Sequence, residues 1–248
     1  MKRAPLFRVL ALAAVFAGCA RQPYVVQRHT ARLYSFDSTS APDSALVRLI
    51  RPYKAGVDTL MTTVIGQAAI PLTKAQPECT LGNFMADAQL DAARKIDARV
   101  VASVVNYGGI RLPYLPPGPV TKGAMFELMP FDNIVTIVEV PGSVLYRFAD
   151  HMAARKGWPV AGMRYTVKDK KATGLTLDGQ EVDSARIYKI TVSDYIAGGG
   201  DDCDFLRPLK KRYTSVFLRD AMMAYIAALD KTGQPLFPKI EGRVSYAE

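Results

Sequence analysis

The sequence predicts a single α+β domain in which helices are layered against mixed β-sheets. The chain has 248 residues, of which 49% are hydrophobic and 22% charged, a composition typical of folded globular domains. Apolar runs of strand length alternate irregularly with segments in which apolar residues recur every three or four positions. An irregular alternation of this kind favours mixed sheets in one α+β or α/β domain.

Four segments have the spacing or the composition of helices. In 81–96 the apolar residues fall on one helical face, and Thr80 is placed to cap its amino end. The others are a short helix over 122–128, an amphipathic helix over 143–155 and a last helix from Leu218 to near Gly233.

Strands are predicted where β-branched and other apolar residues run together. Residues 99–105 form a continuous apolar run, which favours a strand buried on both faces. Residues 106–119, with three glycines and four prolines, are predicted to be an irregular loop. Further strands are expected over 57–67, 134–140, 163–167, 175–177, 186–192 and 242–246.

The amino terminus carries the pattern of an export signal. Basic residues precede an apolar run of about ten residues, which is too short to span a bilayer. Small residues followed at once by Cys19 resemble a bacterial lipobox, so Cys19 is the expected lipidation site; a plain signal peptide is the alternative. We expect a lipoprotein signal peptide over 1–18, a tether over 19–55 and the domain over 56–248. The chain is then exported and lipid-anchored in the bacterial cell envelope, at the periplasmic face or the outer membrane.

Composition excludes several classes of function. Two histidines and three cysteines are too few for a His-rich metal centre, so no metal site is expected. The net charge of +9 is not gathered into a basic stripe with interleaved aromatic residues, so nucleic acid is not an expected partner. Cys79 and Cys203 follow the signal segment, and their pairing is left open, with two inert thiols favoured over a disulfide.

Three loops contain residues suited to binding a ligand. Residues 106–111 (Asn-Tyr-Gly-Gly-Ile-Arg) combine glycines, which let a ligand approach the backbone, with an arginine that can bind phosphate or carboxylate. Residues 129–133 (Met-Pro-Phe-Asp-Asn) place an aromatic ring and an amide in one turn. Residues 194–201 combine an aromatic ring, three glycines and an aspartate that can accept hydrogen bonds from vicinal hydroxyls.

Each of these loops also has a plainer interpretation. The first is compatible with a tight turn after a strand, and the second with a core phenylalanine in an ordinary turn. The third loop, with Asp202 and Asp204 close by, is also compatible with a calcium site, although its spacing does not fit the EF-hand loop.

Taken together, the three patterns resemble the C-terminal domain of the 5′-nucleotidase/UDP-sugar hydrolase family. They are Asn-x-Gly-Gly-Ile-Arg, Pro-Phe-x-Asn, and an aromatic residue followed six positions later by aspartate. Residues 80–88 look like the family's opening helix, and all four blocks keep the family's order and spacing over residues 56–247. The resemblance implies the α+β fold of that domain and the recognition of a nucleotide or nucleoside.

The resemblance implies roles for the residues around the base. Phe131 and Tyr195 match two aromatic residues that sandwich the nucleobase. Asn106 and Asn133 match residues that approach the base edge. Stacking tolerates every base and contributes about 1–3 kcal/mol per base.

The family resemblance also implies roles for residues near the ribose and the phosphate. Asp201 matches the acid that holds the ribose hydroxyls, and Arg111 matches an arginine directed to the phosphate side, while Gly108 and Gly109 lie beside the base edge. Asn83, in the opening helix, is expected to be mainly structural and is a weaker ligand candidate.

The sequence departs from the family pattern at several positions. Tyr107 stands where a glycine is usual, Asp132 replaces the glycine common after the stacking phenylalanine, and Asp202-Cys203 replaces a glycine–aromatic pair. These departures leave the ligand class unchanged and the particular nucleotide open. His151, on a predicted helix, is expected to be a packing or surface residue and not a catalytic base.

The hydrolytic half of the family is a separate N-terminal metallophosphatase domain, and its metal-binding blocks are absent from this sequence. Those blocks are Asp-x-His, Gly-Asn-His-Asp/Glu and Gly-His-x-His, which bind two metals, and His29 and His151 cannot replace them. The resemblance therefore implies a chain with no catalytic residue and no cofactor of its own. It would present nucleotides to a separately encoded metallophosphatase subunit that holds two divalent metals. The alternatives are a surface lipoprotein that binds nucleosides without an enzymatic partner, and a structural lipoprotein with a degenerate pocket.

Overall fold

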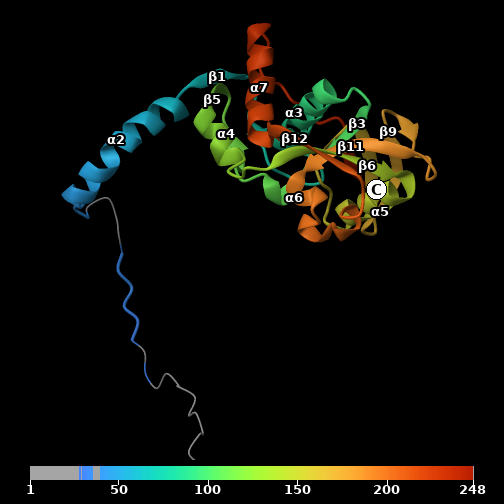
Figure 1. Cartoon of the computed structure of the whole chain (residues 1–248), viewed down its shortest axis with the longest axis horizontal. Helices are drawn as coiled ribbons and strands as arrows, with labels where there is room; N and C mark the ends of the chain where they lie inside the picture. The colour runs from blue at the N-terminus through green and yellow to red at the C-terminus, as the bar shows by residue number, and fades with distance from the viewer. Residues whose placement is uncertain (1–27, 29, 36–39, 248) are drawn as a thin grey trace, which may run out of the picture. The chain divides into compact units, whose positions relative to one another are not determined.

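The computed structural model describes residues 28, 30–35 and 40–247, of which those from Ile50 onward belong to one compact unit (Figure 1). The expected signal peptide and Cys19 lie outside the described residues. None of the described helices combines the length and the apolarity that crossing a bilayer requires.

Helix α2 (Ser44–Met61) occupies part of the predicted tether and the first part of the predicted strand 57–67. The first part of that strand prediction was wrong, because β1 (Val64–Ala68) begins only after the helix has ended; the last part of the prediction coincides with this strand. The Asp43 carboxylate accepts a hydrogen bond from the Ala45 amide over 2.8 Å and so caps the helix. Apolar residues spaced at three and four positions continue through Val57, and this spacing outweighs the local β-branched composition.

The central sheet has five strands in the order β12-β6-β11-β3-β7. The pair β11 and β3 is parallel, whereas the other neighbouring pairs are antiparallel. The bounds are β3 (Val100–Val104), β6 (Ile134–Pro141), β7 (Val160–Ala161), β11 (Ile187–Ser193) and β12 (Lys211–Phe217). The strands predicted over 99–105, 134–140 and 186–192 are thereby confirmed.

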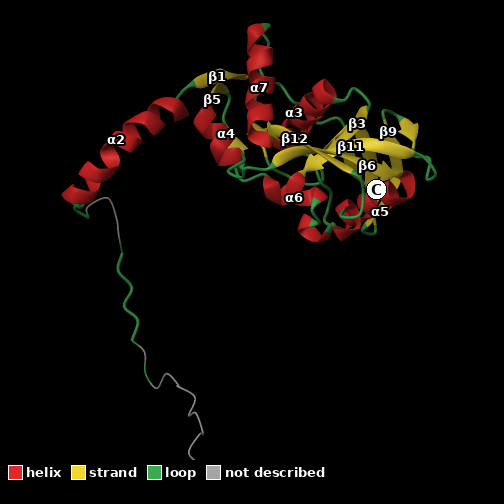
Figure 2. Ribbon diagram, in the orientation of Figure 1, coloured by secondary structure: helices red, strands yellow, loops and turns green. Residues whose placement is uncertain are grey.

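The two faces of this sheet are covered by different helices, as Figure 2 shows for α3 and α5. Successive residues of a strand point to opposite faces. Val135 and Ile137 of β6 therefore pack into one apolar cluster with α3 and α7, while Val138 and Val140 pack into the other with α5. The helices are α3 (Thr80–Ile96), α4 (Lys122–Leu128), α5 (Gly142–Ala154) and α7 (Leu218–Lys231), close to the predicted bounds.

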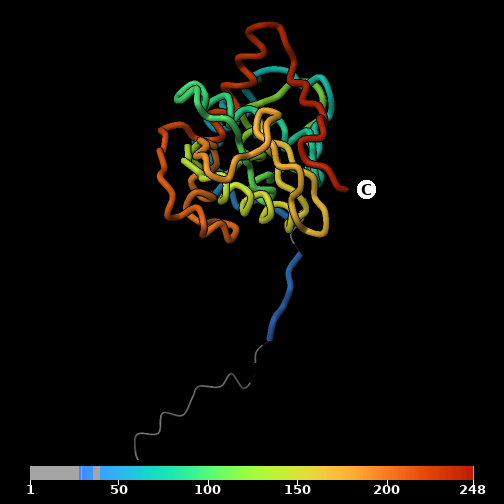
Figure 3. The backbone as a smooth tube through the Cα atoms, turned by 90° about the vertical axis from the view of Figure 1, so that its right-hand side faces the viewer, coloured from blue at the N-terminus to red at the C-terminus, as the bar shows by residue number. Residues whose placement is uncertain are grey.

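A second sheet, in the order β10-β9-β8-β13, packs against α5. Its last strand runs parallel to β8, so the C-terminus lies beside this sheet (Figure 3). The bounds are β8 (Met163–Lys168), β9 (Lys171–Leu177), β10 (Gln180–Glu181) and β13 (Val244–Tyr246). Two small two-stranded sheets pair β1 with β5 (Gly118–Thr121) and β2 (Leu72–Thr73) with β4 (Tyr114–Leu115).

The α+β fold is confirmed, with two further local corrections. Thr80 does not cap α3: the cap is Cys79, whose sulfur accepts the Gly82 amide over 3.3 Å, and Thr80 Oγ1 accepts the Thr73 amide instead. Strand β12 was not predicted, because its residues carry no apolar run and their alternation is broken, with Arg212 and Tyr213 both exposed.

Candidate functional site

The sheet topology brings the three predicted loops to one edge. Because β3 and β11 are parallel neighbours, the loops that follow them begin at the same edge. Strand β6 is antiparallel to β11, and Val135 pairs with Ser193, so the loop that precedes β6 also ends there. Segments around residues 106, 131 and 195 therefore meet.

These loops line an open cavity of about 360 Å³, within the range of small-molecule sites. All of its lining residues were predicted as ligand contacts from the sequence, and they are Asn106, Gly108, Gly109, Arg111, Phe131, Asn133, Tyr195 and Asp201.

Asp201 is the centre of a hydrogen-bond network at this cavity. Its two carboxylate oxygens accept the Asn106 side-chain amide and the Tyr195 hydroxyl, each over 2.8 Å. Asp201 has a left-handed backbone with φ of 50°, and its own N–H donates to the Tyr195 hydroxyl oxygen over 3.2 Å. The hydrogen bond to Asp201 raises the pKa of Tyr195, so this hydroxyl stays protonated at neutral pH.

The glycines let aromatic and amide groups lie against the backbone. A Cβ added at Gly200 would lie 2.5 Å from the Tyr195 ring, and one added at Gly109 would lie 2.9 Å from Asn106 Oδ1. A side chain at position 200 would therefore have to displace the Tyr195 ring, and one at position 109 the end of the Asn106 side chain, independent of any ligand.

The Phe131 turn is held by a buried arginine that sequence reasoning missed. Arg219, on α7, donates to the carbonyl oxygens of Met129 and Phe131 over 3.2 and 3.4 Å, and pairs with the Asp132 carboxylate at 2.9 Å. Asp132, one of the departures from the family pattern, thus has a partner. The Phe131 ring itself is 41% exposed and is not a core residue.

Two cations lie beside the first loop. The Arg111 guanidinium is 5.6 Å from the centre of the Phe131 ring, and Lys74 Nζ is 4.4 Å from the centre of the Tyr107 ring. Burial and the nearby Arg111 charge lower the pKa of Lys74. Tyr107, which replaces a glycine of the family, packs half-buried under Lys74 and does not line the cavity.

Helix α6 (Asp194–Ala197) carries Tyr195 and is tied to the start of β6. The Asp194 carboxylate accepts the Ile134 amide over 2.9 Å, and the Ser193 hydroxyl caps the helix by accepting the Ile196 amide. Tyr195 is thereby fixed relative to the neighbouring Asn133 segment.

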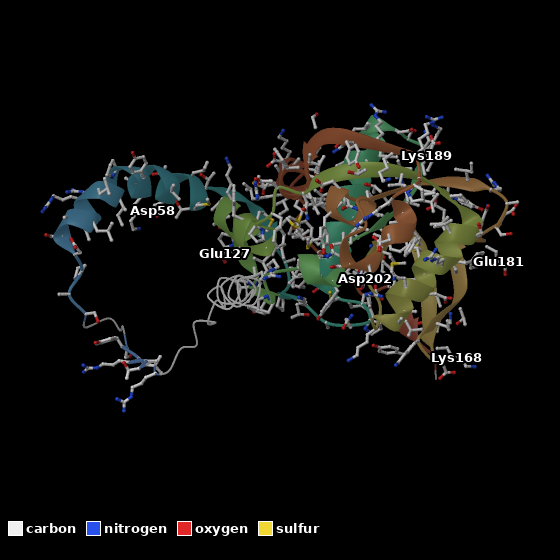
Figure 4. The ribbon with its side chains drawn as sticks, turned by 60° about the horizontal axis from the view of Figure 1, so that its bottom comes forward. Asp58, Glu127, Lys168, Glu181, Lys189 and Asp202 are labelled. Carbon is white, nitrogen blue, oxygen red and sulfur yellow. The ribbon has the colours of Figure 1, made fainter. Side chains whose placement is uncertain are left out.

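His151 hydrogen-bonds to the loop of residues 194–201, which is called the aspartate loop below. Its Nε2 donates to the Asp201 carbonyl over 2.9 Å, which leaves Nδ1 to accept a hydrogen bond from Arg155 at 3.2 Å. Arg155 also pairs with the exposed Asp202 carboxylate at 2.7 Å, so the Asp202 departure from the family pattern too has a partner. Figure 4 shows where Asp202 lies in the domain. Burial lowers the pKa of His151, and its ring packs against Phe148, Trp158 and Phe205.

The two described cysteines are buried free thiols, not a disulfide. Cys203 lies under the aspartate loop, where its sulfur is 3.5 Å from His151 Nε2. Burial raises the pKa of Cys203 to about 12, which keeps the thiol neutral and unreactive.

Asn83 does not belong to the cavity. It is fully buried in α3, where its side-chain amide donates to the Glu78 carboxylate and to the Lys239 carbonyl over 2.6 and 2.8 Å. Glu78 also accepts the Glu241 and Arg243 amides, so these residues hold the C-terminal segment. Across residues 28, 30–35 and 40–247, no three His, Cys, Asp or Glu side chains gather closely enough to hold a metal ion.

Comparisons with known proteins match this chain to one family. The model of the family "5′-nucleotidase, C-terminal domain" matches residues 62–207. Protein 5NUC of Lutzomyia longipalpis is 27% identical over 82% of this chain and 41% of its own length. The 5′-nucleotidase of Diplobatis ommata is 24% identical over 86% of this chain and 42% of its own length. The chain thus spans less than half the length of either relative.

A solved structure shares the fold. The 5′-nucleotidase precursor of Thermus thermophilus superposes with a TM-score of 0.70 at 24% identity, over 84% of this chain and 44% of that one. The family match covers more than half of the sequence and contains all three cavity loops. The chain therefore belongs to the family of 5′-nucleotidase C-terminal domains.

Proposed function

We propose that this chain is the nucleotide- or nucleoside-recognition half of a split 5′-nucleotidase-type hydrolase. The observation that carries the proposal is the cavity at the sheet edge, where two partly exposed aromatic rings, an arginine and a hydrogen-bonded aspartate line one space. Phe131 and Tyr195 offer stacking surfaces, Asp201 offers acceptors to sugar hydroxyls, and Arg111 offers donors to a phosphate.

The proposed role is non-catalytic. The chain has two histidines, and its described part lacks a cluster of metal ligands, so water activation by two metals is assigned to a separate metallophosphatase. Protein 5NUC of Lutzomyia longipalpis and the 5′-nucleotidase of Diplobatis ommata are more than twice as long as the region they match, which leaves room in them for a domain of that kind. No step of hydrolysis is assigned to a residue of this chain.

Helix α2 offers a surface for such a partner. Its apolar residues Leu46, Ile50, Tyr53, Val57 and Leu60 form one stripe, and all of them are exposed. The helix ends at Met61, directly before the region that matches the family. We place the contact with the metallophosphatase on this stripe.

The lipid anchor at Cys19 and the location in the bacterial cell envelope remain part of the proposal. They rest on the amino-terminal pattern of basic residues, apolar run and cysteine. Mass spectrometry of the chain purified from membranes tests this, since a diacylglycerol-modified Cys19 at the amino terminus is expected and an unmodified Met1 would contradict it.

The recognition role is tested by separating binding from hydrolysis. The purified chain is expected to bind adenosine and AMP with a dissociation constant on the order of 10 μM to 1 mM, and to leave AMP intact in the presence of divalent metals. Hydrolysis that survives chelation and is lost in a Phe131→Ala variant would refute the non-catalytic assignment.

A further inference from the structure

The carboxylate of Asp201 is held from two sides before any ligand binds. Asn106 Nδ2 donates to one oxygen and the Tyr195 hydroxyl to the other, each over 2.8 Å. A carboxylate offers about four lone-pair positions, so each oxygen can still accept one further hydrogen bond. Two donors on opposite oxygens hinder rotation of the carboxylate about its last side-chain bond.

Tyr195 is itself fixed in the position that this contact requires. Its ring lies against the backbone of Gly200, where a Cβ would come within 2.5 Å of the nearest ring carbons. Its hydroxyl oxygen accepts the backbone N–H of Asp201 at 3.2 Å while its proton is donated to the carboxylate. The hydroxyl therefore joins the side chain and the backbone of one left-handed residue.

We propose that the Tyr195 hydroxyl is a positioning group that aligns the Asp201 carboxylate for the vicinal hydroxyls of a ribose, and so makes this site selective for ribonucleosides over sugars without that diol. The inference rests on the proposed function, since it names what one group of the nucleoside site does. A phenylalanine at position 195 would keep the stacking ring and lose the alignment.

Selectivity for the ribose diol follows from the free-energy cost of immobilising the Asp201 carboxylate. A diol that meets an aligned carboxylate forms two charge-assisted hydrogen bonds without first having to immobilise it. A ligand without the diol gains nothing from the alignment, because its contacts are made by the aromatic rings and the base-edge amides. The Tyr195 hydroxyl therefore strengthens the binding of ligands that have a vicinal diol and does not change the binding of ligands that lack it.

The test compares adenosine with 2′,3′-dideoxyadenosine on the full chain and its Tyr195→Phe variant, by NMR titration up to millimolar ligand. Wild type is expected to prefer adenosine, and Tyr195→Phe to reduce that preference about tenfold, the effect of weakening one hydrogen bond to a charged group. Tyr195→Leu, which also removes the ring, is the matched control and is expected to weaken both ligands.

Other outcomes overturn the inference. A preference for adenosine that is unchanged in Tyr195→Phe, or increased because the hydroxyl had competed with the sugar, would contradict the positioning role. Equal binding of the two nucleosides by wild type would contradict diol recognition itself. If wild type binds neither nucleoside, the proposed function fails first, and that result is distinct from a failure of the Tyr195 assignment alone.

Discussion

The side-chain amide of Asn106 donates a hydrogen bond to the carboxylate of Asp201 across 2.8 Å, although 95 residues separate them in the chain. Asn106 follows β3 and Asp201 follows β11, and these strands are the parallel pair of the central sheet. The contact therefore exists because two parallel strands end at one edge, where open α/β sheets commonly bind ligands. The contact joins the loop of residues 106–111, assigned to the base edge, to the loop of residues 194–201, assigned to the sugar, in the proposed site.

Gly200→Ala is expected to weaken the binding of dideoxyadenosine by about tenfold, as stacking worth about 1–3 kcal/mol is partly lost, and that of adenosine further, because the displaced ring takes the Tyr195 hydroxyl away from Asp201. The added methyl would lie 2.5 Å from the Tyr195 ring and must displace it. Gly56→Ala, in open space on α2, is the matched control and should bind as wild type does. Unchanged affinity in Gly200→Ala would show that the ring position does not matter for binding.

Arg219→Met is expected to lower the free energy of unfolding by about 1–3 kcal/mol, because the buried carbonyl oxygens of Met129 and Phe131 lose a charged donor. The affinity for adenosine should fall as well, since the Phe131 turn loses its support. Chemical denaturation and a nucleoside titration measure the two effects. Arg212→Met, an exposed arginine of β12, is the control. An Arg219→Met protein as stable as that control would contradict the role of Arg219.

The pH dependence of stability is expected to include a contribution from His151. Burial lowers the pKa of His151 below its ordinary 6.5, so below that pH the unfolded chain takes up a proton that the folded chain does not. Stability from the neutral imidazole is complete above about pH 6.5 and is lost as the pH falls from there through the lowered pKa of the folded chain. The titratable groups that face the His151 ring are Arg155, Asp201, Asp202 and Cys203.

His151→Gln removes this titration, so thermal denaturation midpoints of the variant should fall less between about pH 7 and pH 5 than those of wild type. Parallel pH profiles for the two proteins would mean that the imidazole does not titrate with unfolding.

The apolar stripe of α2 is expected to carry the contact with the metallophosphatase. Ile50→Asp with Val57→Asp introduces charges into the stripe at exposed positions, so thermal stability should be unchanged. Metal-dependent AMP hydrolysis that co-purifies with the wild-type chain from envelope extracts should be lost. Ala55→Asp, exposed on the opposite side of the helix, is the control. Activity retained equally by both variants would place the contact elsewhere.

The sequence was most informative where spacing and loop chemistry act locally. The short helix 122–128 was predicted at its observed bounds, and each residue that lines the cavity was named as a ligand contact through the resemblance of the loops to the family pattern. Glycine runs, turn prolines and neighbouring aromatic residues are constraints within a few positions of the chain, so one sequence reveals them.

The sequence was least informative about features that contacts between distant parts of the chain determine. Arg219 reaches the carbonyl of Phe131 across 88 residues, and no local pattern marks it. Strand β12 is an edge strand whose pairing with β6 is irregular between Tyr213 and Phe217, so its alternation is weak. Val57–Met61 has strand-like composition but continues the periodicity of α2, which a shorter window misses.

Isothermal titration of AMP and adenosine into the full chain and into its Phe131→Ala/Tyr195→Ala variant tests the recognition role most directly. We predict saturable binding by the wild type, on the order of 10 μM to 1 mM, that is lost in the double variant while the fold is kept. Binding that persists in the double variant, or no binding by the wild type at millimolar ligand, would contradict the assignment of this cavity to a nucleotide.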